Sequence, residues 1–206
     1  MLASRIRKAI VNPGAALQLF WALAKGQYYK TTLPLRGVRF SAGRNLRIFG
    51  KLTVSGPGRV VFGDNVTVGM HVTPFTHHRD AEIRIGHHCF LNGTRLGCQE
   101  LIQVGDYCIL AESRIMDTNF HSMRADRWNP SAPIKTAPVI LEENVWIAAE
   151  AGILPGTKIG RNSVVGFGSV CSGTFPSDVL ITGNPAKIVR AVEPAPAEVE
   201  NSESSS

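Results

Sequence analysis

Apolar positions recur every six residues between Leu141 and Val170. This spacing matches neither the 3.6-residue period of an α-helix nor the two-residue alternation of a β-strand. A second set of small or β-branched residues follows the first set by four positions. The aliphatic anchors are Leu141, Ile147, Ile153, Ile159 and Val165, and the small positions are Val145, Ala151, Thr157, Ser163 and Ser169.

A six-residue period predicts a parallel β-helix. Each coil of such a helix is a triangle of three short strands, so one turn takes about eighteen residues. The anchor and the small residue face the interior, and the backbone of each coil pairs with the coils above and below. An ordinary β-sandwich is the alternative, but it does not account for an unbroken period. We therefore expect an all-β protein.

The same register continues upstream, where polar turn residues follow the anchors. The tetrapeptides FGDN, IGHH, VGDY, LEEN and IGRN each place turn-forming residues after an aliphatic residue. The upstream anchors are predicted to be Phe62, Val68, Ile85, Leu91, Val104, Leu110 and Met116.

The register lapses at residues 73–82 and again at 117–139. The first lapse predicts an irregular coil. The second, DTNFHSMRADRWNPSAPIKTAPV, is too polar and proline-rich to stay inside the stack, so we expect a projecting loop. Long loops on rigid scaffolds often carry function.

The two ends of the chain differ from its middle. Residues 1–51 are predicted to be a basic, partly helical and amphipathic appendage, although their start also imitates a signal or transit peptide. Residues 52–191 are the predicted β-helix domain, closed by a cap at 171–191. The acidic, low-complexity residues 192–206 are predicted to be disordered.

The net charge of +6 is unevenly distributed. The first 63 residues contain eleven Lys and Arg and no acid, whereas residues 192–206 contain four Glu and no base. A basic segment favours an anionic neighbour such as a membrane surface or a nucleotide, with a solvated surface as the alternative. No apolar run approaches the roughly 20 residues of a membrane span.

The four cysteines form no CxxC pair. Cys89 and Cys108 fall at the inward small position of the repeat. We interpret them, with Cys98 and Cys171, as buried free thiols, which suit a reducing compartment. Zinc binding is the alternative.

The segment WIAAEAGILPGTKIGRNSVVGFGSV, followed by GNPAKIVR, resembles the C-terminal signature of the hexapeptide-repeat acyltransferases. The resemblance runs from roughly Phe62 to Arg190. It is strongest to galactoside and maltose O-acetyltransferases and to acetyltransferases of bacterial polysaccharide synthesis. It implies a left-handed β-helix, a homotrimer, and acetyl-CoA bound between neighbouring subunits. The free thiols favour a cytoplasmic location.

Acetyl transfer to a hydroxyl needs a base, donors for the oxyanion and two substrates held together. The resemblance implies that His121 is the base, because it follows Gly105 by the sixteen residues that separate the family's catalytic histidine from the corresponding glycine. An imidazole accepts protons near neutral pH. A solvent-exposed loop histidine is the alternative.

The acceptor is expected to contact Asn92, Asp117, Asn119 and Trp146. Asn92 aligns with a family asparagine that binds acceptor hydroxyls, and Trp146 with tryptophans that flank the site. Asp117 and Asn119 precede His121 and are able to bind its ring or orient the acceptor. For the three polar residues the alternative is a role in turn formation. For Trp146 the alternative is a corner position that covers the stack.

The resemblance also implies a path for the CoA arm along small residues of successive coils. Phe167 replaces the usual alanine, and Ser172 and Gly173 replace the usual Thr-Lys, so another cation is needed for the nucleotide phosphates. The expected CoA-binding residues are Ala148, Ala149, Gly166, Phe167, Lys187 and Arg190.

These features predict an O-acetyltransferase acting on a sugar, a nucleotide sugar or a lipid-linked glycan of the cell surface. We expect peripheral contact with the inner face of the membrane and no nucleic-acid binding. N-acetylation of an amino sugar or a xenobiotic is the nearest alternative. A zinc protein resembling γ-class carbonic anhydrases is more distant, because no two histidines have the five-residue spacing of that zinc site. An inactive scaffold is also more distant, because His121 is present.

Overall fold

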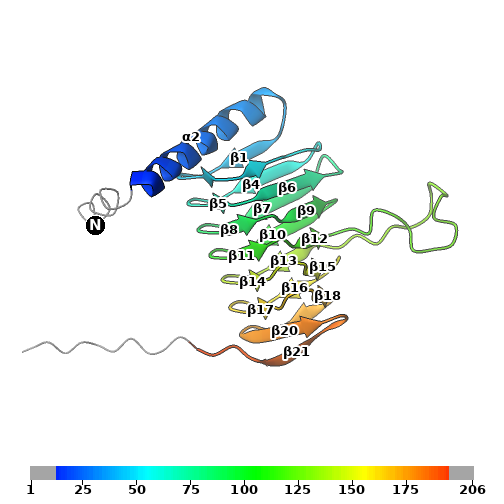
Figure 1. Ribbon diagram of the computed structural model, residues 1–206. Helices are drawn as coiled ribbons and strands as arrows, with labels where there is room; N and C mark the ends of the chain where they lie inside the picture. Colours follow the sequence, from blue (N-terminus) through cyan, green and yellow to red (C-terminus); the bar gives the residue numbers. More distant parts are fainter. Residues whose placement is uncertain (1–12, 195–206) are drawn as a thin grey trace, which may run out of the picture.

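The computed structural model describes residues 13–194 and shows a parallel β-helix with one helix at its N-terminal end (Figure 1). Each coil contributes one strand to each of three sheets, and neighbours within a sheet come from successive coils. All strand pairs are parallel except the last, β20 with β21. The predicted fold class is confirmed, and the architecture is consistent with the left-handed form.

The chain enters the first, second and third sheets in turn, and each coil repeats this order. The first contains β1 (Phe40–Ala42), β4 (Arg59–Phe62), β7 (Glu82–Ile85), β10 (Leu101–Val104), β13 (Val139–Leu141), β16 (Lys158–Ile159) and β19 (Thr174–Phe175). The second contains β2 (Arg47–Ile48), β5 (Thr67–Val68), β8 (Phe90–Asn92), β11 (Ile109–Ala111), β14 (Trp146–Ile147), β17 (Val164–Val165), β20 (Val179–Gly183) and β21 (Ala186–Ala191). The third contains β3 (Lys51–Leu52), β6 (His71–Thr76), β9 (Arg95–Cys98), β12 (Arg114–Met116), β15 (Gly152–Ile153) and β18 (Val170–Cys171).

The six-residue repeat forms the core of the helix. The five anchors from Leu141 to Val165 and the small residue four positions after each of them are all buried. Like residues stack in register, as Leu110, Ile147 and Val165 do on consecutive coils. Burying each aliphatic side chain contributes about 1.5–3 kcal/mol, so the repetition itself stabilises the stack.

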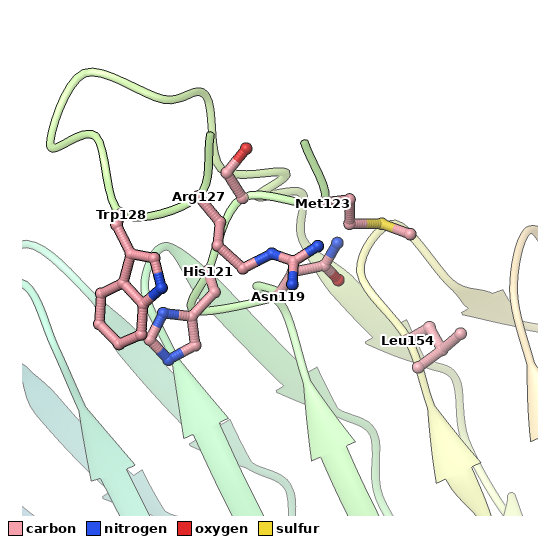
Figure 2. A pocket seen from close by; sticks show the side chains of 7 residues that line it. Asn119, His121, Met123, Arg127, Trp128 and Leu154 are labelled. Atoms are coloured by element: carbon pink, nitrogen blue, oxygen red, sulfur yellow. The ribbon is translucent and has the colours of Figure 1, made fainter. Parts of the chain in front are cut away.

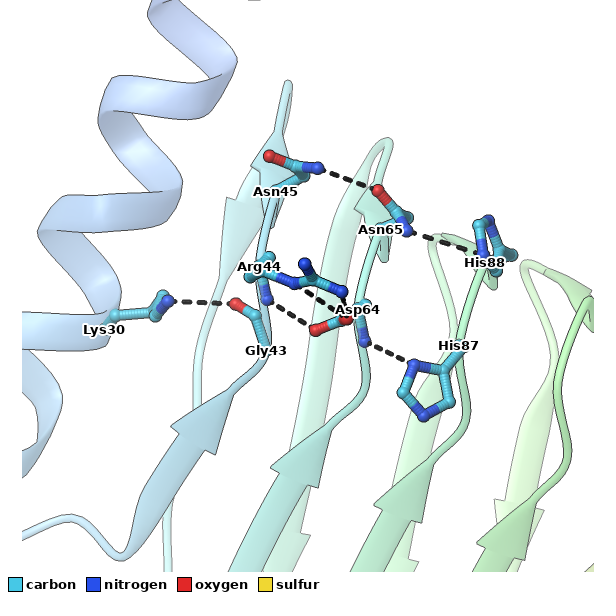
Figure 3. A network of polar contacts seen from close by, with 8 residues as sticks. All are labelled: Lys30, Gly43, Arg44, Asn45, Asp64, Asn65, His87 and His88. Atoms are coloured by element: carbon cyan, nitrogen blue, oxygen red, sulfur yellow. Dashed lines mark hydrogen bonds and ion pairs between the residues drawn. The ribbon is translucent and has the colours of Figure 1, made fainter.

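The turn tetrapeptides form the first corner, between the first and second sheets. Their fourth residues have positive φ, from 56° at Asn144 to 62° at Asn65, a conformation that asparagine tolerates well. The corner side chains also contact one another along the stack. Figure 3 shows Asn45 bonded to Asn65, Asn65 to His88, and the backbone N–H of Asp64 donating to His87.

The prediction that Met116 is an anchor is wrong, because Ile115 points inward and Met116 is half-buried. Ile115 stacks between Leu96 and Ile153. The second corner, between the second and third sheets, is one residue shorter in this coil. The chain turns there at Glu112, with φ 38°, and the register therefore advances by five.

The β-helix begins at Phe40 rather than at residue 52. The anchor of the first coil is Ala42, which pairs with Phe62 of the next coil. Alanine gives only a weak hydrophobic signal, which explains the error. The expectations for residues 1–12 and 195–206, including the leader and most of the tail, lie outside the described residues.

Helix α2 (Pro13–Leu35) covers the first coil. Gly26 lies against the Leu46 carbonyl, and the Nζ of Lys30 donates to the carbonyl of Gly43 (2.9 Å). The helix thus covers an edge that would otherwise be open.

The expected amphipathic pattern of this segment is absent from the described helix. Leu19, Phe20 and Trp21 are consecutive and all exposed, although successive helical residues point in different directions. Apolar side chains therefore surround the N-terminal part of α2 instead of forming one stripe.

Candidate active site

The long loop leaves the stack at the third corner, between β12 and β13, and projects from it (Figure 1). Hydrogen bonds join the two ends of the loop, residues 118–119 and 135–136, which we call its neck. The Thr136 hydroxyl donates to that of Thr118 (3.0 Å), and the backbone N–H of Asn119 donates to the carbonyl of Lys135 (3.1 Å). The neck anchors the chain two residues before His121, which limits where this histidine can lie.

Asp117 does not occupy the expected substrate-binding position. Its side chain is fully buried, and its carboxylate accepts backbone N–H bonds from Gln99 (2.7 Å), Glu100 (2.7 Å) and Leu101 (2.8 Å). These bonds close the third corner of the preceding coil. Asp117 therefore has a structural role, and its two oxygens are not available to His121 or to an acceptor.

A groove of about 680 Å³ opens at the base of the loop. Figure 2 shows His121, Asn119, Arg127 and Trp128 around it, so the structure brings two of the expected residues together. Sequence reasoning missed the others, although a tryptophan in an otherwise polar loop is a signal, and Trp128 is 91% exposed. The additional lining residues are Ser122, Met123, Arg127, Trp128 and Leu154.

The position of His121 is supported by an aromatic cluster that includes the residue before it. Phe120, the preceding residue, stacks on Phe75 (5.8 Å between ring centroids) and packs against His77 (4.7 Å). Gly97 lies under this cluster, where a larger side chain would collide with Phe75 and Phe120. Phe120 has φ 60°, an unusual value for a bulky residue that persists only when the surrounding structure holds it.

Asn92 and Trp146 lie on another part of the same chain. Asn92 ends β8, and its Oδ1 accepts the backbone N–H of Met70 (2.9 Å). Trp146 points outward from the second sheet beside Ile109 and is 46% exposed. Within one chain, the third sheet separates these residues from His121.

The expected CoA residues are close together, along the second corner. Ala148 and Gly166 follow the inward residues Ile147 and Val165, which are partners on adjacent strands. The next two strands continue this row with Thr182 and Lys187, which are also partners. The structure thus aligns two small residues with an exposed lysine on successive strands.

The remaining CoA candidates flank this row. Ala149 follows Ala148 at the corner, and Phe167 is 74% exposed beside Gly166. Arg190 also lies on β21, but its guanidinium is paired with Glu193 (3.5 Å). Lys187 is therefore the more accessible cation at this end of the row.

The histidines outside the groove have structural neighbours. His87 and His88 belong to the first corner, His77 to the aromatic cluster, and His71 bonds to Thr53 (2.9 Å). Among residues 13–194, no three His, Cys, Asp or Glu side chains are grouped as a metal site would require.

The four cysteines are buried and free, as predicted. Burial raises the pKa of Cys171 to about 11. Burial, together with the Asp117 carboxylate, also raises the pKa of Cys98. Neither group is poised as a nucleophile at neutral pH.

Comparisons with known proteins agree with this architecture. Residues 138–173 match the family described as bacterial transferase hexapeptide (six repeats). The chain is 34% identical over 91 residues to galactoside O-acetyltransferase of Lactococcus lactis subsp. lactis (strain IL1403), covering 44% of each protein. It is 28% identical over 162 residues to WbbJ of Escherichia coli (strain K12), named as a candidate lipopolysaccharide biosynthesis O-acetyl transferase, covering 75% of this chain and 69% of WbbJ.

Among solved structures, the polysialic acid O-acetyltransferase OatWY has the same fold, with a TM-score of 0.62 and 22% identity over 79% of this chain and 80% of OatWY. The chain spans less than half the length of the Lactococcus protein. The repeat, the fold and these relatives together show that the chain is similar to the hexapeptide-repeat transferases over residues 138–173 and shares the β-helix fold of OatWY.

Proposed function

We propose that this protein is an acetyl-CoA-dependent O-acetyltransferase that acts on a sugar hydroxyl, in cell-surface polysaccharide or glycolipid synthesis. The observation that carries the proposal is the position of His121. A loop with a closed neck presents this histidine at a groove, on a β-helix whose residues 138–173 match the hexapeptide-repeat transferases. The imidazole makes no hydrogen bond with other described residues, so both ring nitrogens are free to meet a substrate.

The reaction proceeds directly between two bound substrates. The His121 imidazole removes the acceptor proton while the hydroxyl oxygen attacks the thioester carbonyl. The tetrahedral intermediate then collapses, the carbon–sulfur bond breaks, and the imidazolium returns its proton to the leaving thiolate. No protein nucleophile is needed, which fits the four buried thiols.

Acetyl-CoA is the proposed donor, bound along the row from Ala148 to Lys187. The small residues allow the pantetheine chain to approach the wall, and Lys187 supplies charge for the phosphates. In one chain this row and His121 lie at different corners, so a complete site needs two copies.

The second sheet supports the proposed homotrimer. Phe90, Ile109 and Trp146 occupy neighbouring outward positions on successive strands and are 39%, 43% and 46% exposed. A contiguous apolar row of this kind is typical of a surface that another subunit covers. Light scattering will give the subunit number. Mixing inactive His121→Ala subunits with inactive Lys187→Glu subunits should restore partial activity if each site uses two chains.

The N-terminal part of α2 supports the proposed contact with the inner membrane face. No helix within residues 13–194 has the length and apolar character needed to cross a membrane. The exposed apolar side chains near the start of α2 suit the lipid interface instead, and the acid-free N-terminal region suits anionic headgroups. These side chains are Leu17, Leu19, Phe20, Trp21 and Leu23.

The decisive experiment is thiol release from acetyl-CoA by the wild type and by His121→Ala, with sugars, glycosides, nucleotide sugars and amino sugars as acceptors. Release by the wild type alone supports the reaction and the base. Equal release by both proteins contradicts the role of His121. Preference for an amino sugar would indicate N-acetylation, and stoichiometric zinc by elemental analysis would favour a metal enzyme.

A further inference from the structure

Two arginines lie side by side on the outer face of the third sheet. Arg95 on β9 and Arg114 on β12 are partners in register, and both are exposed. Adjacent strands are about 4.8 Å apart, so the two side chains leave the sheet as neighbours. Neither makes an ion pair with a carboxylate within the part of the chain that the structure describes.

Such a pair opposes folding because like charges directly opposite one another on neighbouring strands repel. Elsewhere on the surface the protein relieves cationic charge, with Arg44 beside Asp64 and Arg84 beside Glu82. The outward neighbours of the arginine pair along the sheet are Thr73, Gly152 and Val170, none of which is acidic. No carboxylate on the neighbouring outward positions of this sheet offsets the repulsion.

The pair borders the groove of His121. Gly152, the strand partner of Arg114, precedes the groove residue Leu154 by two positions, a distance of about 7 Å along a strand. Arg95 also extends toward the residues around His121, because its guanidinium carbon lies 4.8 Å from the ring centroid of Phe75. Phe75 in turn stacks on Phe120, next to His121.

We propose that Arg95 and Arg114 bind an acidic group of the acceptor while its hydroxyl meets His121. This inference rests on the proposed function and names the substrate class: an anionic sugar, carrying either its own carboxylate or a phosphate from a nucleotide or lipid carrier. Guanidinium groups bind both anions through paired N–H donors. The stack of Arg95 on Phe75 keeps the Arg95 guanidinium oriented before the acceptor binds.

The first test is steady-state kinetics with matched acceptors: methyl glucoside, glucuronic acid and UDP-glucose. Arg95→Gln and Arg114→Gln should each raise KM for the preferred anionic acceptor at least about tenfold, because each variant removes a hydrogen bond between charged groups. The KM for acetyl-CoA and the kcat should change little. Preference for glucuronic acid identifies the carboxylate, and preference for UDP-glucose identifies the phosphate.

Arg84→Gln is the control, since Arg84 is an exposed arginine on the neighbouring sheet, and it should leave every constant unchanged. Arg114→Lys should recover part of the affinity. A rise in KM for acetyl-CoA instead would assign the pair to the donor. Equal use of methyl glucoside and both anionic acceptors by the wild type would also overturn the proposal.

A binding measurement separates this proposal from the proposed function. Calorimetry of His121→Ala with glucuronic acid and UDP-glucose should detect one of them, and adding Arg114→Gln should weaken that binding about tenfold. If no protein turns over acetyl-CoA but this binding is found, the reaction is wrong and the anion site stands. If neither anion binds, the anion site is wrong whatever the turnover shows.

Discussion

The ring of Phe120 stacks on the ring of Phe75 at an interplanar angle of 26°, immediately before His121 in the chain. Phe75 lies on β6 and Phe120 in the loop, so this contact joins the loop to the rigid stack. With the closed neck, it limits the orientations that His121 can adopt. Loops positioned in this way can carry chemistry that requires precise geometry.

Phe120→Ala should lower kcat about tenfold while changing the KM for the acceptor little, because misplacing His121, the proposed base, affects the transition state more than binding. Steady-state kinetics will measure this split, and Phe120→Tyr should restore the rate. Tyr107→Ala is the matched control, since it removes the His88–Tyr107 stack at a corner distant from the loop. Equal losses of kcat in both alanine variants would show only a general loss of structure.

Asp117→Asn should lower the free energy of unfolding by about 1–3 kcal/mol, because the new amide group faces backbone donors that lose their acceptor. Thermal unfolding will show this as a lower Tm. Asp106→Asn should cost less, since the Asp106 carboxylate accepts one backbone N–H bond, from His87, at an exposed position. An Asp117→Asn variant with unchanged Tm and lost activity would instead favour a direct contact of Asp117 with the acceptor.

The thiols should be inert in the folded protein. Burial raises the pKa of Cys171 to about 11, so at pH 8 its thiolate, the reactive form, is rare. A raised folded-state pKa means that the protonated thiol is favoured by folding, and raising the pH through that value should weaken stability. A disulfide exchange reagent at pH 8 should label no cysteine rapidly, and four after denaturation; rapid labelling without denaturant would contradict the buried positions.

Replacing Leu17, Phe20 and Trp21 together with Gln should abolish sedimentation with phosphatidylglycerol vesicles and leave Tm unchanged, because these side chains are exposed. Wild-type binding should weaken as salt increases, since the headgroup contribution is electrostatic. Tyr28→Gln, in the part of α2 that lies over the first coil, is the control. Equal sedimentation of the triple variant and the wild type would rule out a lipid contact through this part of α2.

The sequence by itself determined the fold, because a six-residue repeat is local information that each coil repeats. Leu141, Ile147 and Ile153 point inward for the same reason, and Asn144 and Asn162 reveal the corner through their tolerance of positive φ. The position of His121 on a projecting loop also followed from the sequence, since a polar segment cannot remain inside an apolar stack.

Only the tertiary structure decided which residues meet across coils. The inward role of Ile115 depends on a shortened corner, and the burial of Asp117 depends on backbone donors about one coil earlier. Arg95 and Arg114 become neighbours because one turn of this irregular coil takes nineteen residues, as their register shows. Coil length and corner conformation set these contacts, and neither follows from periodicity alone.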